Sequence, residues 1–217
     1  MQLNLVKRFN NLRNLFQLVQ SLQTPGLDQV LAVGDALQKT EMAKHSRSWM
    51  KSDARVAALI AERYAPERPS LAELLTLPVD TLGYQYANML TANGITAEAL
   101  EAEHPIVSDD DYLIDRLRTT HDITHIVTGF GIDTAGELGL QAFNLSQNRS
   151  PLAVLLIASV LMQTLKEGED PKPVLRAVAR GVELADRCDL LIAQRWEDGW
   201  ERPVSEWRHQ LGLPVEL

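Results

Sequence analysis

The sequence of 217 residues contains one cysteine, Cys188, so it cannot form an internal disulfide. The chain therefore fits a reducing compartment, and a metal site in it would not depend on thiolates. Its longest weakly charged run has an apolar core of only residues 152–162, whereas a membrane-spanning helix needs about 20 residues. No signal-peptide pattern is present. These absences favour a cytoplasmic protein that would meet a membrane only at its surface.

Basic residues are also few. Lys and Arg number 21 against 29 Asp and Glu, which gives a formal net charge of −8. A field of this sign repels phosphate backbones, so general nucleic-acid binding is not expected. The contents of hydrophobic (45%) and charged residues (23%) are typical of globular proteins. We interpret residues 1–217 as one domain, because this length can bury one core.

Apolar residues recur at helical spacing and nowhere alternate as in strands, so the expected fold class is all-α. Residues 1–23 form a basic amphipathic stripe that can lie on an anionic membrane or pack against the domain or a dimer partner. Caps and breakers predict a helix from about residue 28 and further helices over residues 56–64, 71–76, 78–93, 109–128, 134–146, 151–165, 173–196 and 204–211.

Four residues around position 125 have the chemistry of metal ligands. On a helix that is continuous to residue 128, His121, Asp122 and His125 share an arc of about 100° on one face. A glycine-rich turn follows, and a tight helical hairpin would bring Glu137 to the same ion. Two imidazoles with carboxylates suit zinc first, with iron, cobalt, manganese and magnesium as alternatives. The sequence therefore predicts a divalent-metal site.

Two features near this site have more than one interpretation. Arg118 lies in the middle of the predicted ligand arc, where it can bind an anionic substrate group or pair with Asp122. The predicted helix over residues 151–165 is apolar all round, so it must be covered either as a core helix or by an apolar ligand in a groove. Tryptophans 196, 200 and 207 are expected in core or dimer contacts rather than in a membrane belt.

The spacing His121-Asp-Ile-Thr-His125, eleven residues, then Glu137 resembles the signature of the coenzyme Q (ubiquinone) biosynthesis protein four family. Further pieces match between residues 77 and 213: Leu77-Pro78, Thr81-Leu82-Gly83, Tyr86, Arg116, Arg118, Thr128-Gly129, Gly136, Phe143, Pro151, Trp196-Glu197 and Arg208. The sequence departs from the family pattern at Gln141 and Asn144, where the family usually has a lysine and often an acid.

The resemblance implies an all-α, dimeric, membrane-associated protein with a long apolar groove between helices. It implies a metal held by His121, Asp122, His125 and Glu137, and oxidative C1 decarboxylation of a polyprenylated aromatic acid. Glu137 and Arg118 are the expected catalytic residues, and Arg118 and Tyr86 the expected substrate-binding residues. The implied partners are an isoprenoid lipid, other quinone-biosynthesis proteins and a second copy of the chain.

Two other functions fit the same residues. The first is a scaffold of a biosynthetic complex that binds an isoprenoid lipid without turnover. The second is a helical metal-dependent phosphohydrolase, which the pair His121-Asp122 suggests. That chemistry needs a further upstream histidine, for which His45 and His104 are available.

Overall fold

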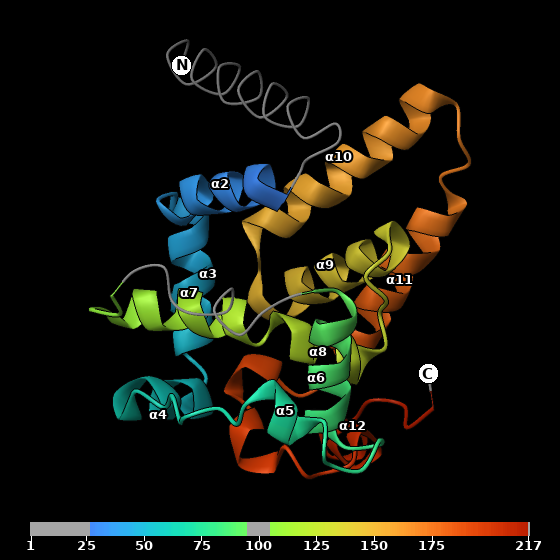
Figure 1. The fold of residues 1–217 in the computed structure, drawn as a ribbon. Coiled ribbons are helices and arrows are strands. Elements are labelled where there is room, and N and C mark those ends of the chain that lie inside the picture. The colour runs from blue at the N-terminus through green and yellow to red at the C-terminus, as the bar shows by residue number, and fades with distance from the viewer. Residues whose placement is uncertain (1–26, 95–104, 217) are drawn as a thin grey trace.

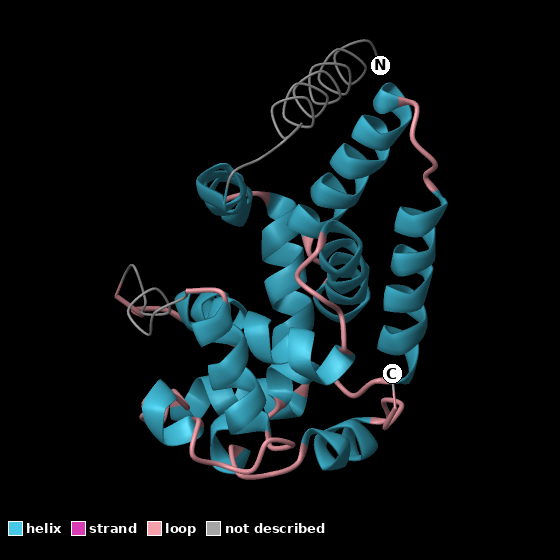
Figure 2. Cartoon of the chain, turned by 45° about the vertical axis from the view of Figure 1, so that its right-hand side comes forward, coloured by secondary structure: helices cyan, strands magenta, loops and turns pink. Residues whose placement is uncertain are grey.

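The computed structural model describes residues 27–94 and 105–216, in which every regular element is a helix, so the predicted all-α fold class is confirmed (Figures 1 and 2). The predicted helix over residues 1–23 lies outside the described residues. The elements are α2 (Leu27–Gln38), α3 (Glu41–Lys51), α4 (Ala54–Glu62), α5 (Leu71–Leu74), α6 (Leu82–Ala92), α7 (Asp109–Thr119), α8 (His121–Thr128), α9 (Thr134–Asn148), α10 (Pro151–Glu167), α11 (Lys172–Arg187), the 3₁₀ turns η2 (Leu191–Ala193) and η3 (Trp196–Gly199), and α12 (Val204–Leu211).

The largest apolar cluster surrounds the short helix α8. Ile123 and Val127 of α8 are fully buried among residues of α5, α6, α9, α11 and the C-terminal segment. The tryptophans of that segment, Trp196, Trp200 and Trp207, are at most 6% exposed, which confirms the expected core packing. The face of α8 that carries Ile123 and Val127 is thus fixed in the core, and this fixes the direction in which the opposite face points.

Helices α9 and α11 lie side by side and touch at their glycines (Figure 1). A Cβ atom on Gly181 would lie 2.1 Å from the carbonyl oxygen of Gly139, so no larger residue fits at position 181 without moving a backbone. This close approach holds α9 against α11, and α9 also contacts α8.

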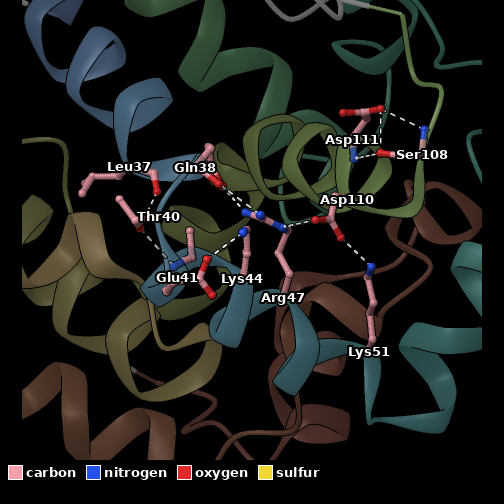
Figure 3. A network of polar contacts seen from close by, with 11 residues as sticks. Leu37, Gln38, Thr40, Glu41, Lys44, Arg47, Lys51, Ser108, Asp110 and Asp111 are labelled. Carbon is pink, nitrogen blue, oxygen red and sulfur yellow. Dashed lines mark hydrogen bonds and ion pairs between the residues drawn. The ribbon is translucent and has the colours of Figure 1, made fainter.

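A polar network joins α3 to the start of α7 (Figure 3). The buried guanidinium of Arg47 donates from Nε to Asp110 at 2.7 Å and from Nη1 to the side chain of Gln38 at 2.7 Å. Lys51 donates to the other oxygen of Asp110 at 2.5 Å. The two bound oxygens of Asp110 thus hold α7 to α3, and the contact of Arg47 with Gln38 holds α2 to α3.

The predicted continuous helix over residues 109–128 is wrong. It breaks at Thr120, where φ is −105° and ψ is 2°, and so forms α7 and α8. The hydroxyl of Thr120 donates to the carbonyl oxygen of Arg116 at 2.7 Å, and threonine hydroxyls of this kind compete with the regular helical ladder. The predicted angular position of Arg118 relative to the histidines therefore does not hold.

Two other helix boundaries differ from prediction. The helix expected over residues 173–196 ends at Arg187, because residues 190–193 are all buried, which a helix with one apolar face cannot achieve. The helix expected from Pro78 starts at Leu82, because the backbone of residues 80–82 forms hydrogen bonds with the C-terminal segment instead of within a helix. Leu82 N donates to Arg202 O at 2.9 Å, and Val204 N donates to Asp80 O at 2.9 Å.

Helix α10 is not covered all round, contrary to its predicted burial. Val154, Met162 and Leu165 are 49%, 40% and 65% exposed, and few residues of α10 are fully buried. Among the described residues no helix is long and apolar enough to cross a bilayer. The exposed row on α10 is therefore apolar surface at the side of the molecule, and the groove predicted beside it stays a prediction.

Candidate metal centre

Helix α8 presents two histidines on one face. His121 and His125 are one turn apart, and their Nε2 atoms lie 3.2 Å from each other. The face opposite them is fixed by the buried Ile123 and Val127. At its C-terminus α8 stops at Gly129, whose φ of 70° is the left-handed conformation that glycine adopts at low cost. The chain then turns back toward α9.

The turn brings Glu137 to the histidines. Asp133 caps α9 by accepting hydrogen bonds from Ala135 N (3.0 Å) and Gly136 N (3.1 Å). One residue further on, Oε1 of Glu137 lies 3.2 Å from Nε2 of His125. One ligand atom from each of His121, His125 and Glu137 lies within 4.8 Å of the other two. The predicted hairpin therefore exists, and it assembles three of the four predicted ligands.

The orientation of His125 is set by the turn itself. Its Nδ1 lies 3.0 Å from the carbonyl oxygen of Phe130, which can only accept, so Nδ1 carries the hydrogen. In the neutral imidazole Nε2 then has a free lone pair, directed at His121 and Glu137. The lone pair on Nε2 of His125 and the carboxylate of Glu137 repel each other unless a cation lies between them. Either a proton or a metal ion can occupy that position.

The electrostatics of the two histidines differ. Burial acts to lower the pKa of His125, but the hydrogen bond and the negative charge of Glu137 outweigh it, so that this pKa is raised. Burial, together with the adjacent His125, lowers the pKa of His121. At neutral pH the site therefore holds at least one neutral imidazole beside a carboxylate, which is the donor set of a divalent cation.

The distances test whether a metal fits these residues. Tetrahedral ligands that bind zinc with bonds of about 2.0–2.1 Å are themselves roughly 3.3 Å apart. The two separations of 3.2 Å at Nε2 of His125 agree with that spacing, whereas the three ligand atoms together are only within 4.8 Å of one another, so His121 and Glu137 would move closer on binding. Three protein ligands with a fourth position open are typical of catalytic rather than structural zinc sites. The residues present fit a divalent metal.

Asp122 does not join the three clustered ligands. Burial keeps the pKa of His121 lowered and Glu137 raises that of His125, and the negative charge of Asp122 is a smaller influence that acts to raise both. The structure thus places Asp122 near the site without bringing its carboxylate into the group that satisfies the ligand distances. Its assignment as a fourth metal ligand stays a prediction.

The two predicted substrate-binding residues are not members of this cluster. Arg118, which is 30% exposed, donates from Nη2 to Asp115 at 3.3 Å. Tyr86 is 2% exposed, stacks on Trp200 with ring centroids 5.2 Å apart, and lines a cavity of about 370 Å³. Neither role is tested by these positions.

Sequence reasoning missed the groups that hold α7 and α8 in place. Arg116 makes a bidentate ion pair with Glu197 (2.6 and 3.1 Å), and both side chains are at most 4% exposed. Arg208 of α12 donates to the carbonyl oxygens of Val127 (3.0 Å) and Ile126 (2.9 Å) at the end of α8. Each contact joins residues about 80 positions apart, and no local pattern in the sequence indicates such a pair.

Comparisons with known proteins agree with the signature in the sequence. A protein-family model described as "Coenzyme Q (ubiquinone) biosynthesis protein Coq4" matches residues 6–216. A crystal structure from Nostoc punctiforme, whose description assigns it provisionally to ubiquinone biosynthesis, superposes with a TM-score of 0.82 at 35% identity and covers 95% of this chain and 97% of the other.

Curated fungal relatives are more distant. The chain is 30% identical over 201 residues to "Ubiquinone biosynthesis protein coq4, mitochondrial" of Neosartorya fischeri, covering 90% of this chain and 69% of that protein. It is 29% identical over 177 residues to the protein of the same name from Sclerotinia sclerotiorum, covering 76% of this chain. The match spans only 61% of the length of the Sclerotinia protein.

Proposed function

This chain belongs to the Coq4 family of coenzyme Q (ubiquinone) biosynthesis proteins, and from that premise we propose that it is a metal-dependent protein acting on a polyprenylated aromatic acid. The observation that carries the proposal is the convergence of His121, His125 and Glu137 at the family signature. The proposed reaction is oxidative C1 decarboxylation: the bond from C1 to the carboxylate breaks and carbon dioxide leaves, a hydroxyl group from water takes its place at C1, one proton is released, and an external two-electron oxidant takes up the electrons.

In this proposal His121, His125 and Glu137 hold the metal, and Asp122 adds negative charge beside it. A bound divalent cation would supply Lewis acidity for the ring substituents. The chain's own residues orient the site: Phe130 O holds the ring of His125, and Glu137, whose side chain is 39% exposed, can accept or return a proton. Arg118 is the proposed partner of the substrate carboxylate.

Metal analysis tests the first half of the proposal. Protein purified without a polyhistidine tag should bind one equivalent of zinc or another divalent ion, and the His121→Ala, His125→Ala double variant should bind none. The matched control is His45→Ala on α3, which should bind as wild type, because His45 does not belong to the ligand cluster. Equal binding by wild type and double variant would reject the site.

Turnover tests the second half. Labelled carbon dioxide should be released from a carboxylated precursor by wild-type protein and not by Glu137→Ala. A protein that retains the metal and the lipid but releases no carbon dioxide would instead be the non-catalytic scaffold.

One observation favours lipid binding in either case: the exposed apolar row of Val154, Met162 and Leu165 on α10 offers a surface for an isoprenoid tail or an apolar partner. Mass spectrometry of gently purified protein should find an isoprenoid. A second copy of the chain, other quinone-biosynthesis proteins and a membrane surface are the further proposed partners. The phosphohydrolase alternative gains no support, because no other histidine joins the cluster among the described residues.

A further inference from the structure

One face of α9 leads away from the candidate metal centre. At about 100° per residue, Gln141 and Asn144 lie within about 40° of Glu137 around the helix axis. A rise of about 1.5 Å per residue places them about 6 and 10 Å further along the helix than Glu137. Because the carboxylate of Glu137 lies against His125, this face continues the surface on which a metal-bound ligand would lie.

The opposite face of α9 packs against α11. A Cβ atom on Gly181 of α11 would lie within 3.0 Å of atoms of residues 139, 142 and 143. These positions lie about 140–240° from Glu137 around the axis of α9. Helix α11 therefore covers the side of α9 that faces away from Glu137. On the side of Glu137, both Gln141 and Asn144 are half-buried, so each keeps part of its surface open to a ligand.

The side-chain amides of Gln141 and Asn144 have no hydrogen-bond partner among the described residues, and their polar atoms remain accessible. A third amide of α9 differs: Gln147 donates from Nε2 to Cys188 O at 3.1 Å and accepts at Oε1 from Leu191 N at 3.0 Å. Gln147 thus has a structural role that the other two amides lack. Each of the two unpaired amides offers donors and an acceptor to a ligand.

The charge around this face is negative. Glu137 is the only charged residue of α9. Glu137 and Asp122 both act to raise the pKa of His121 and of His125, so both charges that act on the histidines from outside the pair are carboxylates. An ionised ligand group over the two unpaired amides would find no cation on α9. A hydroxyl or ether oxygen there would find a hydrogen-bonding partner without a charge to balance.

We propose that Gln141 and Asn144 form a specificity subsite that binds uncharged oxygen substituents of a ligand, hydroxyl or ether groups, and disfavours ionised ones. The inference deepens the proposed function and rests on it, because the ligand is the one that reaches the cluster of His121, His125 and Glu137. At positions 141 and 144 the family usually has a lysine and often an acid, so this preference would distinguish the chain from such relatives.

Substituted benzohydroxamates test the subsite, because the hydroxamate binds zinc and the group at C4 of the ring reaches beyond it. Calorimetric titration of the zinc-loaded full chain measures the affinity for probes with a hydroxymethyl, a methyl or a carboxylate group at C4. Wild type should bind the hydroxymethyl probe about three- to tenfold more tightly than the methyl probe, and about tenfold or more tightly than the carboxylate probe.

Two variants should change these preferences in different ways. The Gln141→Leu, Asn144→Leu double variant should lose the preference for hydroxymethyl over methyl while its affinity for the methyl probe is kept. Gln141→Lys should raise the affinity for the carboxylate probe about tenfold, since it supplies the missing cation. Ser146→Ala, about 180° from Glu137 on the same helix, is the matched control and should bind all three probes as wild type.

A structural role is distinguished by stability. Because neither amide has a partner, the double leucine variant should unfold at the same urea concentration as wild type. If no hydroxamate bound in the presence of zinc, the metal centre would be rejected and the subsite with it. If the hydroxamates bound but wild type did not distinguish hydroxymethyl from methyl, or the double leucine variant kept the preference, only the subsite would be overturned.

Discussion

At the scale of single residues, the cluster of His121, His125 and Glu137 depends on one backbone carbonyl and one glycine. The carbonyl is that of Phe130, which holds Nδ1 of His125 and turns Nε2 toward Glu137. The glycine is Gly136, directly before Glu137: a Cβ there would lie 2.0 Å from the carbonyl oxygen of Gly131. The first turn of α9 can therefore approach the hairpin loop only when position 136 has no side chain.

Substituting Gly136 should damage both fold and site. We expect Gly136→Ala to lower the free energy of unfolding by about 1–3 kcal/mol, because the added methyl group meets backbone atoms that cannot rotate away. The displaced first turn of α9 should also weaken zinc affinity about tenfold or more. Urea unfolding and competitive zinc titration measure the two effects.

Gly34 provides the matched control on α2. A Cβ there would make an ordinary 3.7 Å contact with Leu152, so Gly34→Ala should leave zinc affinity unchanged and stabilise the helix by about 0.5–1 kcal/mol. If Gly136→Ala were as stable as wild type and bound zinc equally well, the close approach at position 136 would have no role in the site.

The side chains of the site were predictable, but their supports were not. His121 and His125 follow from the spacing of four on a helix, and Glu137 from the glycine turn between two helices. The acceptor on Phe130 is a backbone atom, and every residue type has one. Asp122 shares the helix face in the sequence pattern, yet it stands outside the cluster, because angular position alone does not set how far a short side chain reaches.

At the scale of elements, α8 is a helix of only eight residues that is held at its end by another helix. A helix this short has little stability of its own. The positive charge of Arg208 at its C-terminal carbonyls both satisfies orphan acceptors and complements the helix dipole. Helix α12 therefore supports the candidate metal centre although it supplies none of the three clustered residues.

Removing this support should loosen the site without removing a ligand. Arg208→Met is expected to cost about 1–3 kcal/mol of stability, through the loss of two hydrogen bonds to buried carbonyls, and to weaken zinc affinity severalfold. Arg187→Met, which breaks only an exposed pair with Glu183, is the control and should change stability by less than about 0.5 kcal/mol. Equal effects of the two substitutions would contradict the role of Arg208.

The network between α3 and α7 should make stability depend on pH. Burial acts to raise the pKa of Asp110, but the hydrogen bonds from Lys51 and Arg47 outweigh it, so the pKa is lowered in the folded state. A lowered pKa contributes stability that is complete above the unfolded value, about 3.9, and is lost as pH falls through the folded value.

Asp110→Asn should therefore cost about 1 kcal/mol at pH 7, a value that allows for the 40% exposure of the carboxylate. The difference from wild type should be constant down to about pH 5 and should shrink as pH falls below 4. Asp109→Asn, whose pair with Arg63 is exposed, is the control for the same helical turn and should differ little from wild type. Urea titrations between pH 3 and pH 7 measure both.

A helix was predictable from the sequence where a capping residue precedes a segment with one apolar face. Asp133 begins α9, Pro151 begins α10, and α12 spans residues 204–211 as expected. Prediction was wrong where tertiary contacts decide. Thr120 breaks a helix whose periodicity continues through it, and residues 190–193 enter the core as a 3₁₀ turn because all of them are buried.

At the scale of the whole molecule, the metal would join α8 to α9 and so stabilise the folded state. Zinc at 100 times its dissociation constant should add about 2.7 kcal/mol, which corresponds to a rise in Tm of about 5–10 °C for a chain of this length. The double variant His121→Ala, His125→Ala should show no rise, and a chelator should reverse the rise in wild type. Differential scanning calorimetry would contradict the site if both proteins shifted equally.

The order of these groups along the chain has a consequence for how the protein folds. The three clustered residues span only 17 positions, 121–137, so their hairpin has low contact order and we expect it to close early, during synthesis on the ribosome. Glu197 and Arg208 are made about 80 residues after the groups that they hold on α7 and α8. We therefore expect the three residues to meet first in a loosely held hairpin, and α12, which is made later, to fix their geometry.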